Sequence, residues 1–404
     1  MTRTPGEIPV VNFDHHSEDF KERRLDIYKE LRGLCPVVHS PTHDGFDVIS
    51  RYADVGEIAR DPARFSSAAE SLLIPSNRAR KLLPIQVDPP ELDRFRALIS
   101  PFLTPRAIRL HEDAIQVDID EALARIVERG TAELVGEFCE LIPTRATMRL
   151  IGFDPANWEV FAKPLHDAAF SIPGSPAQVE AIRQIHQFDS IIEKEVDARY
   201  KTPCGDLISE LIKSEFEGIT TSREEVVNLV RMLIFGGMDT VGAAMSNVVA
   251  LLALRPDLRE FLVSDLERIP RAIEEFLRYE PPIQGFARYI MEDTNVGGCP
   301  VNKGERVFIL WGSANHDEKE FENPATINLE RFPNRHFTFG IGAHRCMGST
   351  MARTEMRMML EALLKALPDF YVTGAGILEP KTIGQILSKR EVNIAIGSDP
   401  SLAG

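Results

Sequence analysis

Apolar residues recur at helical spacing through most of the chain, which predicts a mainly α-helical protein with small β-sheets. Amphipathic helices are predicted at 18–34, 52–59, 106–129, 133–151, 155–172 and 176–200. Short β-like runs predict strands at 37–39, 46–49 and 300–310, and a terminal hairpin at 383–396. Two stretches, 68–87 and 323–338, lack a period, so we expect a long loop and an irregular meander there.

The longest pattern covers 222–254, roughly 32 residues, and predicts a buried helix about 48 Å long. Ser222 and Glu225 form a capping-box pattern at its start. Its middle reads Gly236-Gly237-Met238-Asp239-Thr240. Two glycines in mid-helix cost roughly 1 kcal/mol each, so we expect a ligand to approach closely there. The Thr240 hydroxyl can donate to an upstream carbonyl and bend the helix, which would open a groove.

One cysteine lies in a glycine-rich loop, Phe339-Gly340-Ile341-Gly342-Ala343-His344-Arg345-Cys346-Met347-Gly348, directly before a helical pattern over 348–364. Glycines allow close backbone approach, and the positive end of a helix favours a thiolate. These residues predict a thiolate that faces a closely approached ligand. A glycine-rich turn that carries a buried structural cysteine is the alternative, and Cys346 alone leaves both open.

Composition narrows the function classes. The chain is 44% hydrophobic and 26% charged, as in ordinary globular proteins, and its net charge of −15 disfavours nucleic-acid binding. No run approaches the roughly 20 apolar residues of a membrane span, and 1–9 has no apolar signal core, so we expect a cytoplasmic protein without a membrane anchor. The five cysteines are far apart in sequence and form no CxxC, which argues against disulfides and zinc. Four of them are predicted to be ordinary small hydrophobic residues: Cys35, Cys139, Cys204 and Cys299.

Residues 339–348 resemble the haem-binding loop of the cytochromes P450, Phe-x-x-Gly-x-His-x-Cys-x-Gly. The resemblance implies that Cys346 is the metal ligand, a thiolate on haem iron. Residues 236–240 resemble the (Ala/Gly)-Gly-x-(Asp/Glu)-Thr stretch of helix I in that family. Thr240 and Asp239 are then implied to be catalytic and to handle dioxygen and its protons. The other residues implied to lie against the cofactor are Phe339, Gly340, Gly348 and Gly236.

Further motifs of the family concern haem propionates and the fold. Residues 88–96 resemble the helix C motif Asp-Pro-Pro-Glu-His-x-x-x-Arg, with Leu92 in place of the histidine, and Asp88 is predicted to cap that helix. The implied propionate contacts are Arg96, Arg288 and His344. Pro270 opens a helix that carries Glu275 and Arg278 on one face, which resembles the helix K pair, with Arg331 as the implied third partner. From spacing alone the pair would be an exposed salt bridge.

The motifs occur in the family's order from residue 88 to 348, so the resemblance implies one P450 haem domain over 1–404, with a flexible segment at 1–9. It implies a soluble bacterial monooxygenase of the class I, camphor-hydroxylase-like type, monomeric, with haem b (iron protoporphyrin IX). Such an enzyme uses O2 to hydroxylate or dealkylate a small hydrophobic substrate, terpenoid or aromatic. The chain lacks a Gly-x-Gly-x-x-Gly motif and a ferredoxin cysteine run, so a separate ferredoxin and ferredoxin reductase would supply NAD(P)H electrons. The alternatives are a peroxide-using peroxygenase and a non-catalytic haem protein, neither of which needs the Asp239–Thr240 pair.

Several residues are candidates for the substrate pocket and the partner surface. Phe235 and Met232 precede Gly236 by one and four residues, which predicts that they face the groove. Family position implies three further pocket residues: Ile283, Ile386 and Leu387. Phenylalanines and an isoleucine in the expected lid over the substrate are read as core packing or pocket lining: Phe161, Phe170, Ile172 and Phe188. Basic residues that would suit an acidic ferredoxin are Arg335, Arg345 and Arg353. Three loop cations would either be solvated or anchor a substrate carboxylate: Arg78, Arg80 and Lys81.

Overall fold

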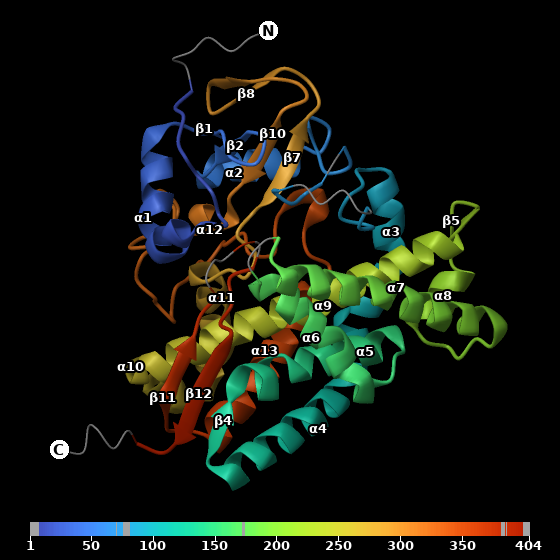
Figure 1. Ribbon diagram of the computed structural model, residues 1–404, viewed down its shortest axis with the longest axis vertical. Coiled ribbons are helices and arrows are strands. Elements are labelled where there is room, and N and C mark those ends of the chain that lie inside the picture. The colour runs from blue at the N-terminus through green and yellow to red at the C-terminus, as the bar shows by residue number, and fades with distance from the viewer. Residues whose placement is uncertain are drawn as a thin grey trace.

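The protein consists of a β-rich part near the N-terminus and a larger helical part with a second sheet at its edge (Figure 1). The computed structural model describes residues 8–69, 71–75, 81–171, 174–380, 384 and 386–398. The longest helix, α9 (Arg223–Leu254), runs through the helical part with other helices on several sides. The fold class predicted from the sequence, mainly α with small sheets, is confirmed.

The β-rich part is organised by a five-stranded sheet with the order β1-β2-β10-β7-β3. Its strands are β1 (Val37–Ser40), β2 (Phe46–Ile49), β3 (Phe65–Ser66), β7 (Phe286–Ile290) and β10 (Arg306–Ile309). β10 lies parallel to β2 and antiparallel to β7, so Val307 pairs with Asp47 on one side and with Arg288 on the other. This register places Arg288 inside the sheet, where its side chain is buried.

Alternating side chains of this sheet pack against helices on its two faces, as the period of a strand requires. Val48 and Phe308 share a core cluster with Phe20 and Tyr28 of α1 (Glu18–Leu34). Ile49 and neighbouring strand residues share another cluster with α2 (Tyr52–Arg60). The short helix α12 (Trp311–Ala314) follows β10, and the β8–β9 hairpin (Thr294–Val296, Cys299–Val301) precedes it.

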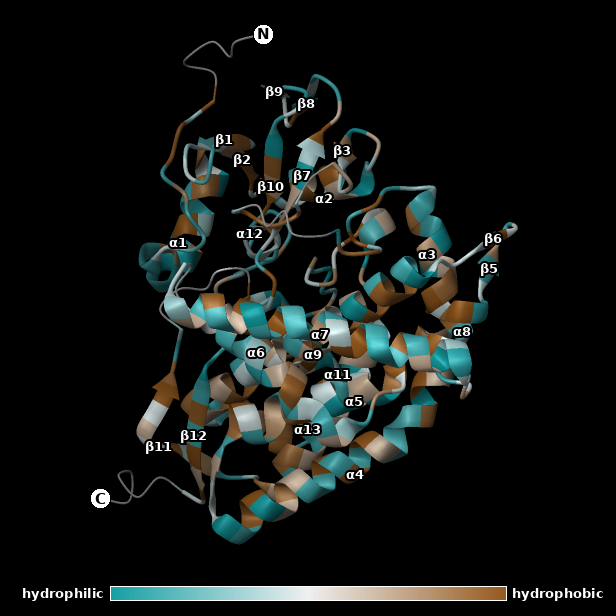
Figure 2. Cartoon of the chain, turned by 45° about the vertical axis from the view of Figure 1, so that its right-hand side comes forward, coloured by the Kyte–Doolittle hydropathy of each residue, from teal (hydrophilic) through white to brown (hydrophobic). Residues whose placement is uncertain are grey.

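The helical part surrounds α9, which the sequence predicted as its central element. Its other helices are α3 (Glu91–Ile99), α4 (Pro105–Arg129), α5 (Leu141–Ile151), α6 (Trp158–Phe170), α7 (Pro176–Lys201), α8 (Leu207–Lys213), α10 (Pro256–Val263), α11 (Ile269–Tyr279) and α13 (Ser349–Ala366). The capping box is present, because the Ser222 hydroxyl accepts from Glu225 N while the Glu225 carboxylate accepts from Ser222 N. Figure 2 shows the apolar residues of α9 lying among its neighbours. In the described part of the chain α9 alone is long and apolar enough to span a membrane, but 72% of its most apolar window is buried in the protein.

Three local predictions were wrong. The stretch 133–151 is not one helix: β4 (Thr131–Glu133) and a π-helical turn (Val135–Cys139) precede α5. The C-terminal sheet pairs β11 (Phe370–Leu378) with β12 (Glu391–Ile396), which also pairs with β4, so the first strand of the hairpin lies before residue 383. Asp88 does not cap α3, whose N-cap position is Pro90, because the Asp88 carboxylate accepts instead from Ser66 Oγ and Ser67 N.

The meander between α12 and the cysteine loop is held by a buried ion pair on α11. Arg278 donates from Nε and Nη2 to the Glu275 carboxylate, at 2.8 Å for both, and neither side chain has exposed surface. Glu275 also accepts from Arg331 Nε at 3.0 Å and from Asn328 N at 2.8 Å. Arg278 Nη1 donates to the carbonyls of Asn315 and Pro324. The pair therefore connects α11 to both ends of the segment that leads to Cys346.

We predict that Arg278→Ala destabilises the fold by about 3–5 kcal/mol, because it leaves the Glu275 charge buried without its main partner. The midpoint temperature of thermal unfolding and the yield of haem-containing protein should both be lower than in the wild type. The matched control is Arg183→Ala, which breaks an exposed pair with Glu180 on α7 at the same spacing and should change neither quantity. Normal yield and an unchanged unfolding midpoint for Arg278→Ala would show that the buried network is not needed.

Candidate active site

The glycine-rich loop is held in place by backbone hydrogen bonds and by close contact with α2. Cys346 N donates to Phe339 O at 2.8 Å, and Gly340 N donates to Phe337 O at 2.8 Å. Gly342 has φ +75°, and a Cβ there would lie 2.4 Å from Ala59 O at the end of α2. Glycine is required at this position because a side chain would collide with a backbone atom that cannot move independently. The loop therefore presents Cys346 from a fixed backbone, ahead of α13.

The sulfur of Cys346 lies near three arginines but is not activated by them. Burial by surrounding atoms raises the pKa of the Cys346 thiol, while the Gly348 N–H and the charges of Arg96, Arg353 and Arg345 act in the opposite direction. The residue nevertheless retains exposed surface. The thiolate therefore stays a prediction, because the N–H at the start of α13 and the arginines favour it while desolvation opposes it. A cation on the sulfur would be needed to hold the thiolate.

Three cationic or polar donors near the loop lack a hydrogen-bonded carboxylate partner among the described residues. Arg288 is buried, which lowers its pKa to about 10, and its Nη1 donates only to Ala287 O, a carbonyl of its own strand. His344 Nε2 is buried without a hydrogen-bond partner, and the nearest carboxylate oxygen, Asp88 Oδ1, lies at 3.7 Å. Arg96 Nη1 donates to Arg345 O at 2.9 Å. Burial lowers the pKa of both Arg96 and His344.

These donors fit an anionic ligand bound beside Cys346. A buried guanidinium without a counter-charge is costly, so an incoming carboxylate would relieve it. Haem b offers two propionates together with an iron that binds thiolate, which suits the set formed by Arg96, Arg288, His344 and Cys346. Leu92, which replaces the usual histidine, is buried in an apolar cluster with Phe95 and offers no donor.

The presence of glycine at the two positions in the middle of α9 has different explanations. A Cβ on Gly237 would lie 2.5 Å from Thr147 Oγ1, so Gly237 is required by the packing of α5 and not by a ligand. A Cβ on Gly236 would meet only the flexible end of Met232, at 3.2 Å. Thr240 Oγ1 donates to Gly236 O at 2.8 Å, as predicted for a threonine that bonds back along its helix. A close approach by a ligand can therefore explain Gly236 only.

Asp239 faces a histidine and a glutamate that the sequence analysis did not identify. Burial and the charge of Glu140 raise the pKa of Asp239 to about 7, with the charge of His166 opposing them. His166 of α6 forms a hydrogen-bonded pair through Nδ1 with Glu140 Oε1, which raises the pKa of His166 against the effect of burial. The glycine at position 242 lets Glu140 pack close to α9, since a Cβ added at Gly242 would lie 3.5 Å from Glu140 Cγ. No motif marks Glu140 or His166, because they come from separate segments and meet only through helix packing.

Comparison with known proteins gives matches to cytochromes P450. The family model for Cytochrome P450 matches residues 175–368. The chain is 31% identical over 366 residues to Cytochrome P450 130 of Mycobacterium tuberculosis, covering 87% of this chain and 90% of that one. It is 29% identical over 392 residues to a Steroid C26-monooxygenase of Rhodococcus jostii, covering 90% and 80%. A structure of a mutant of P450 EryK in complex with erythromycin B superposes with a TM-score of 0.84 at 27% identity, covering 95% and 98%.

The chain belongs to the cytochrome P450 family. It is a P450 monooxygenase, and the cofactor of the family is haem b. Monooxygenases of this family act on hydrophobic substrates with O2 and redox partners. The camphor-hydroxylase-like subclass stays a prediction.

The candidate pocket residues of this P450 lie in two groups. Met232 and Phe235 are half-buried on α9, and the Met232 methyl group is close to Gly236. Ile283 and Ile386 are joined by an isolated antiparallel bridge, which brings two segments far apart in sequence together. Leu387 is buried in the N-terminal core cluster, so its side chain is part of that packing.

The remaining candidates of the lid and loop are only partly described. Phe161 and Phe188 are both buried, with ring centroids 5.0 Å apart, as in core packing. Lys81 is exposed, which fits a solvated loop face. Arg78, Arg80 and Ile172 lie outside the described residues, as does the side chain of Phe170.

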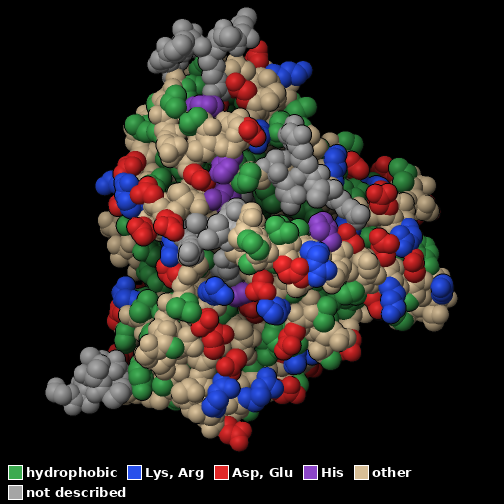
Figure 3. Space-filling model, viewed as in Figure 1, with side chains coloured by type: hydrophobic (Ala, Val, Ile, Leu, Met, Phe, Trp, Pro, Cys, Tyr) green, Lys and Arg blue, Asp and Glu red, His purple; other side chains and the backbone are tan. Residues whose placement is uncertain are grey.

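The basic patch expected for a ferredoxin is smaller than predicted. Arg335 and Arg345 are exposed, but Arg353 forms a two-point pair with Glu274, with Nε–Oε1 at 2.6 Å and Nη2–Oε2 at 2.8 Å. Although burial opposes it, hydrogen bonds from Arg353 and His336 lower the pKa of Glu274 to about 2. Arg353 therefore holds the start of α13 to α11 and contributes little free charge. Acidic and basic side chains are interspersed over the face of the protein in Figure 3.

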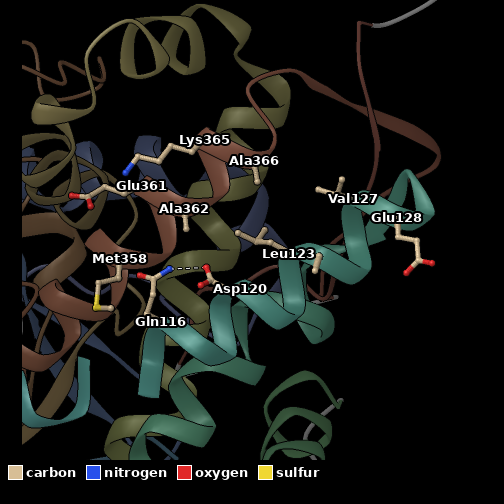
Figure 4. Close-up of a pocket in the computed structure, with 11 residues that line it drawn as sticks. Gln116, Asp120, Leu123, Val127, Glu128, Met358, Glu361, Ala362, Lys365 and Ala366 are labelled. Atoms are coloured by element: carbon tan, nitrogen blue, oxygen red, sulfur yellow. Dashed lines mark hydrogen bonds between the residues drawn. The ribbon is translucent and has the colours of Figure 1, made fainter. Parts of the chain in front are cut away.

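A large surface groove of about 700 Å³ lies away from these residues, between α4 and α13 (Figure 4). Leu123 and Val127 of α4 and Met358 and Ala362 of α13 are among its lining residues, and Gln116 Nε2 donates to Asp120 Oδ1. None of the predicted site residues lines this groove. It is therefore not the place where the cofactor binds.

Asp239→Asn should change how stability depends on pH. The folded wild type keeps the Asp239 proton up to about pH 7, whereas the unfolded chain releases it near the usual value of 3.8. Raising the pH from about 5 to about 8 therefore costs the wild type stability that the asparagine variant keeps. The unfolding midpoint of the variant minus that of the wild type should grow over this range. A difference independent of pH would mean that Asp239 titrates outside it.

Proposed function

We propose that this P450 would hold the iron of haem b through Cys346 Sγ and that it oxidises a hydrophobic organic substrate, with electrons from a separate ferredoxin and its reductase. The observation that carries the proposal is a group of donors beside the cysteine of the glycine-rich loop: among the described residues no carboxylate is hydrogen-bonded to Arg288 or Arg96, and His344 Nε2 lies 3.7 Å from Asp88 Oδ1. These donors would bind the two propionates. We also propose a single cytoplasmic, monomeric haem domain, in which Glu275, Arg278 and Arg331 are structural.

The bound haem supplies the activation of O2 and the oxidation of the substrate. The residues of the protein would position the cofactor and supply the protons that the reaction needs. The Cys346 thiolate would hold the iron and donate electron density to it. Phe339, Gly340 and Gly348 would shape the surface on which the cofactor lies, and Gly236 would leave room on the α9 side.

Asp239 is suited to transfer protons, because a carboxyl group with a pKa of about 7 can both hold and release a proton at neutral pH. We propose that His166 and Glu140 exchange this proton with solvent, since both retain some exposed surface. The Thr240 hydroxyl, which donates to Gly236 O, would place a hydrogen-bond donor on the α9 side of the cofactor, next to this proton source. A peroxygenase would need none of these groups, so the cluster favours the monooxygenase.

We propose an uncharged terpenoid or aromatic substrate, because Met232, Phe235, Ile283 and Ile386 are all apolar. One relative is named a steroid monooxygenase, which fits this class. Titration of the haem protein, followed by the shift from low to high spin, tests the class. Binding confined to charged ligands would overturn this choice without affecting the haem ligand.

Replacing Cys346 by Ala should remove the red-shifted absorption band of the reduced carbon monoxide complex, which depends on a thiolate ligand. Cys204→Ala is the control: it removes an exposed thiol outside the loop and should leave the band unchanged. A Cys346→Ala protein that keeps this band would contradict the assignment of the ligand.

Thr240→Ala should still bind haem and substrate, but a larger share of the electrons consumed should appear as hydrogen peroxide and a smaller share as product. Thr240→Ser keeps the hydroxyl group and should remain close to the wild type. The measurement is the ratio of product and peroxide to reduced nicotinamide consumed. Equal ratios in wild type and both variants would show that the Thr240 hydroxyl has no part in oxygen activation.

A further inference from the structure

Two cysteines that are far apart in sequence meet between α1 and the β8–β9 hairpin. Cys35 directly follows α1, and Cys299 is the first residue of β9. Their sulfur atoms are 3.0 Å apart, and both residues are half-buried. Both pack against core clusters, as expected for small hydrophobic residues, but their contact with each other was not predicted. Cys139 is also buried as expected, whereas Cys204 is exposed, so the expectation is wrong for Cys204 alone.

The backbone around the pair is fixed by contacts that do not involve the thiols. A Cβ on Gly297, in the turn of the hairpin, would lie 2.4 Å from Pro36 Cβ, so the hairpin packs directly on the residue after Cys35. The Val37 N–H is directed at the Cys299 sulfur. The main chain therefore holds the two sulfurs together.

The separation of the sulfurs is shorter than an ordinary contact. Non-bonded carbon atoms, which are smaller than sulfur, prefer ~3.5–4.0 Å. A disulfide has an S–S bond of ~2.05 Å, so forming it here requires the sulfurs to move about 1 Å closer. Small side-chain rotations can supply this movement, and half-burial leaves the pair open to a small oxidant.

We propose that Cys35 and Cys299 are a reversible dithiol–disulfide site that reacts with low-molecular-mass disulfides such as oxidised glutathione. One thiolate attacks the glutathione disulfide, forms a mixed disulfide and releases one glutathione thiolate. The second thiolate then attacks the protein sulfur of that mixed disulfide, forms the Cys35–Cys299 bond and releases the second glutathione thiolate. Two protein thiols lose two protons and two electrons, and one oxidised glutathione becomes two reduced ones.

The environment affects the rate of this exchange. Burial and the neighbouring Cys35 raise the pKa of Cys299, while the positive charge of Arg51 acts in the opposite direction. The thiolate is the attacking species, so the reaction should be slow at neutral pH and faster in mildly alkaline solution. The bond would connect α1 to the β8–β9 hairpin across most of the chain, which restricts the unfolded state and should raise the unfolding midpoint.

The test uses the haem-loaded protein with Cys204→Ser, so that the exposed thiol outside the pair is removed. After incubation with oxidised glutathione, the intact mass should fall by two hydrogen atoms, and digestion should yield one peptide that joins Cys35 to Cys299. Cys35→Ser and Cys299→Ser in the same background should instead gain one glutathione on the remaining partner. Reduced glutathione should reverse all three changes.

Two results would overturn the proposal: glutathione carried separately by both cysteines, or both thiols remaining free in the presence of excess oxidised glutathione. The unfolding midpoint gives a second readout, which should rise on oxidation in the Cys204→Ser protein and should not rise in the same protein with Cys299→Ser, where no bond can form between the two segments. Neither measurement depends on haem chemistry or on a substrate, so a failure here leaves the proposed function untouched.

Discussion

Glu275, which has no exposed surface, accepts five hydrogen bonds from Arg278, Asn328, Arg331 and Asn334. Such a charge is stable in the interior only while all these donors are in place. Its donors come from α11 and from the irregular segment that runs to the cysteine loop. That segment has little regular secondary structure of its own, so the buried carboxylate determines its path. The neighbouring Glu274 likewise stabilises the chain on the other side of the cysteine loop, because it pairs with Arg353 at the start of α13.

The charged side chains on the two sides of the cysteine loop differ in whether they are paired with opposite charges. On the α11 side, Glu274 and Glu275 are matched by arginines and a histidine at hydrogen-bond distance. On the side of the five-stranded sheet, Arg288 is buried, and among the described residues no carboxylate is hydrogen-bonded to it, with Asp88 as a more distant counter-charge. Interiors rarely keep an unmatched charge unless a ligand completes it. The sheet register that fixes Arg288, and the loop that fixes His344, therefore prepare a site for an anionic group next to Cys346.

The family motifs and the long apolar helix predicted most of this arrangement, because they depend on local spacing. Ser222 and Glu225 show their capping box, and Glu275 meets Arg278 and Arg331 as the resemblance implied. The sequence did not predict features that depend on contacts between segments far apart in the chain. Gly237 is small because of Thr147, and Glu140 and His166 meet only through helix packing. Cys35 and Cys299 are neighbours because a hairpin folds back over α1, which no pattern in either segment reveals.

The central claim is that Cys346 and the unmatched donors form one haem site. A crystal structure of the haem-loaded protein tests it most directly. The account predicts a bond from Cys346 Sγ to the iron, with the propionates at hydrogen-bond distance from Arg96, Arg288 and His344, and with α9 crossing the opposite face near Gly236. Haem ligated by another residue, or propionates that leave Arg288 without a carboxylate partner, would contradict it.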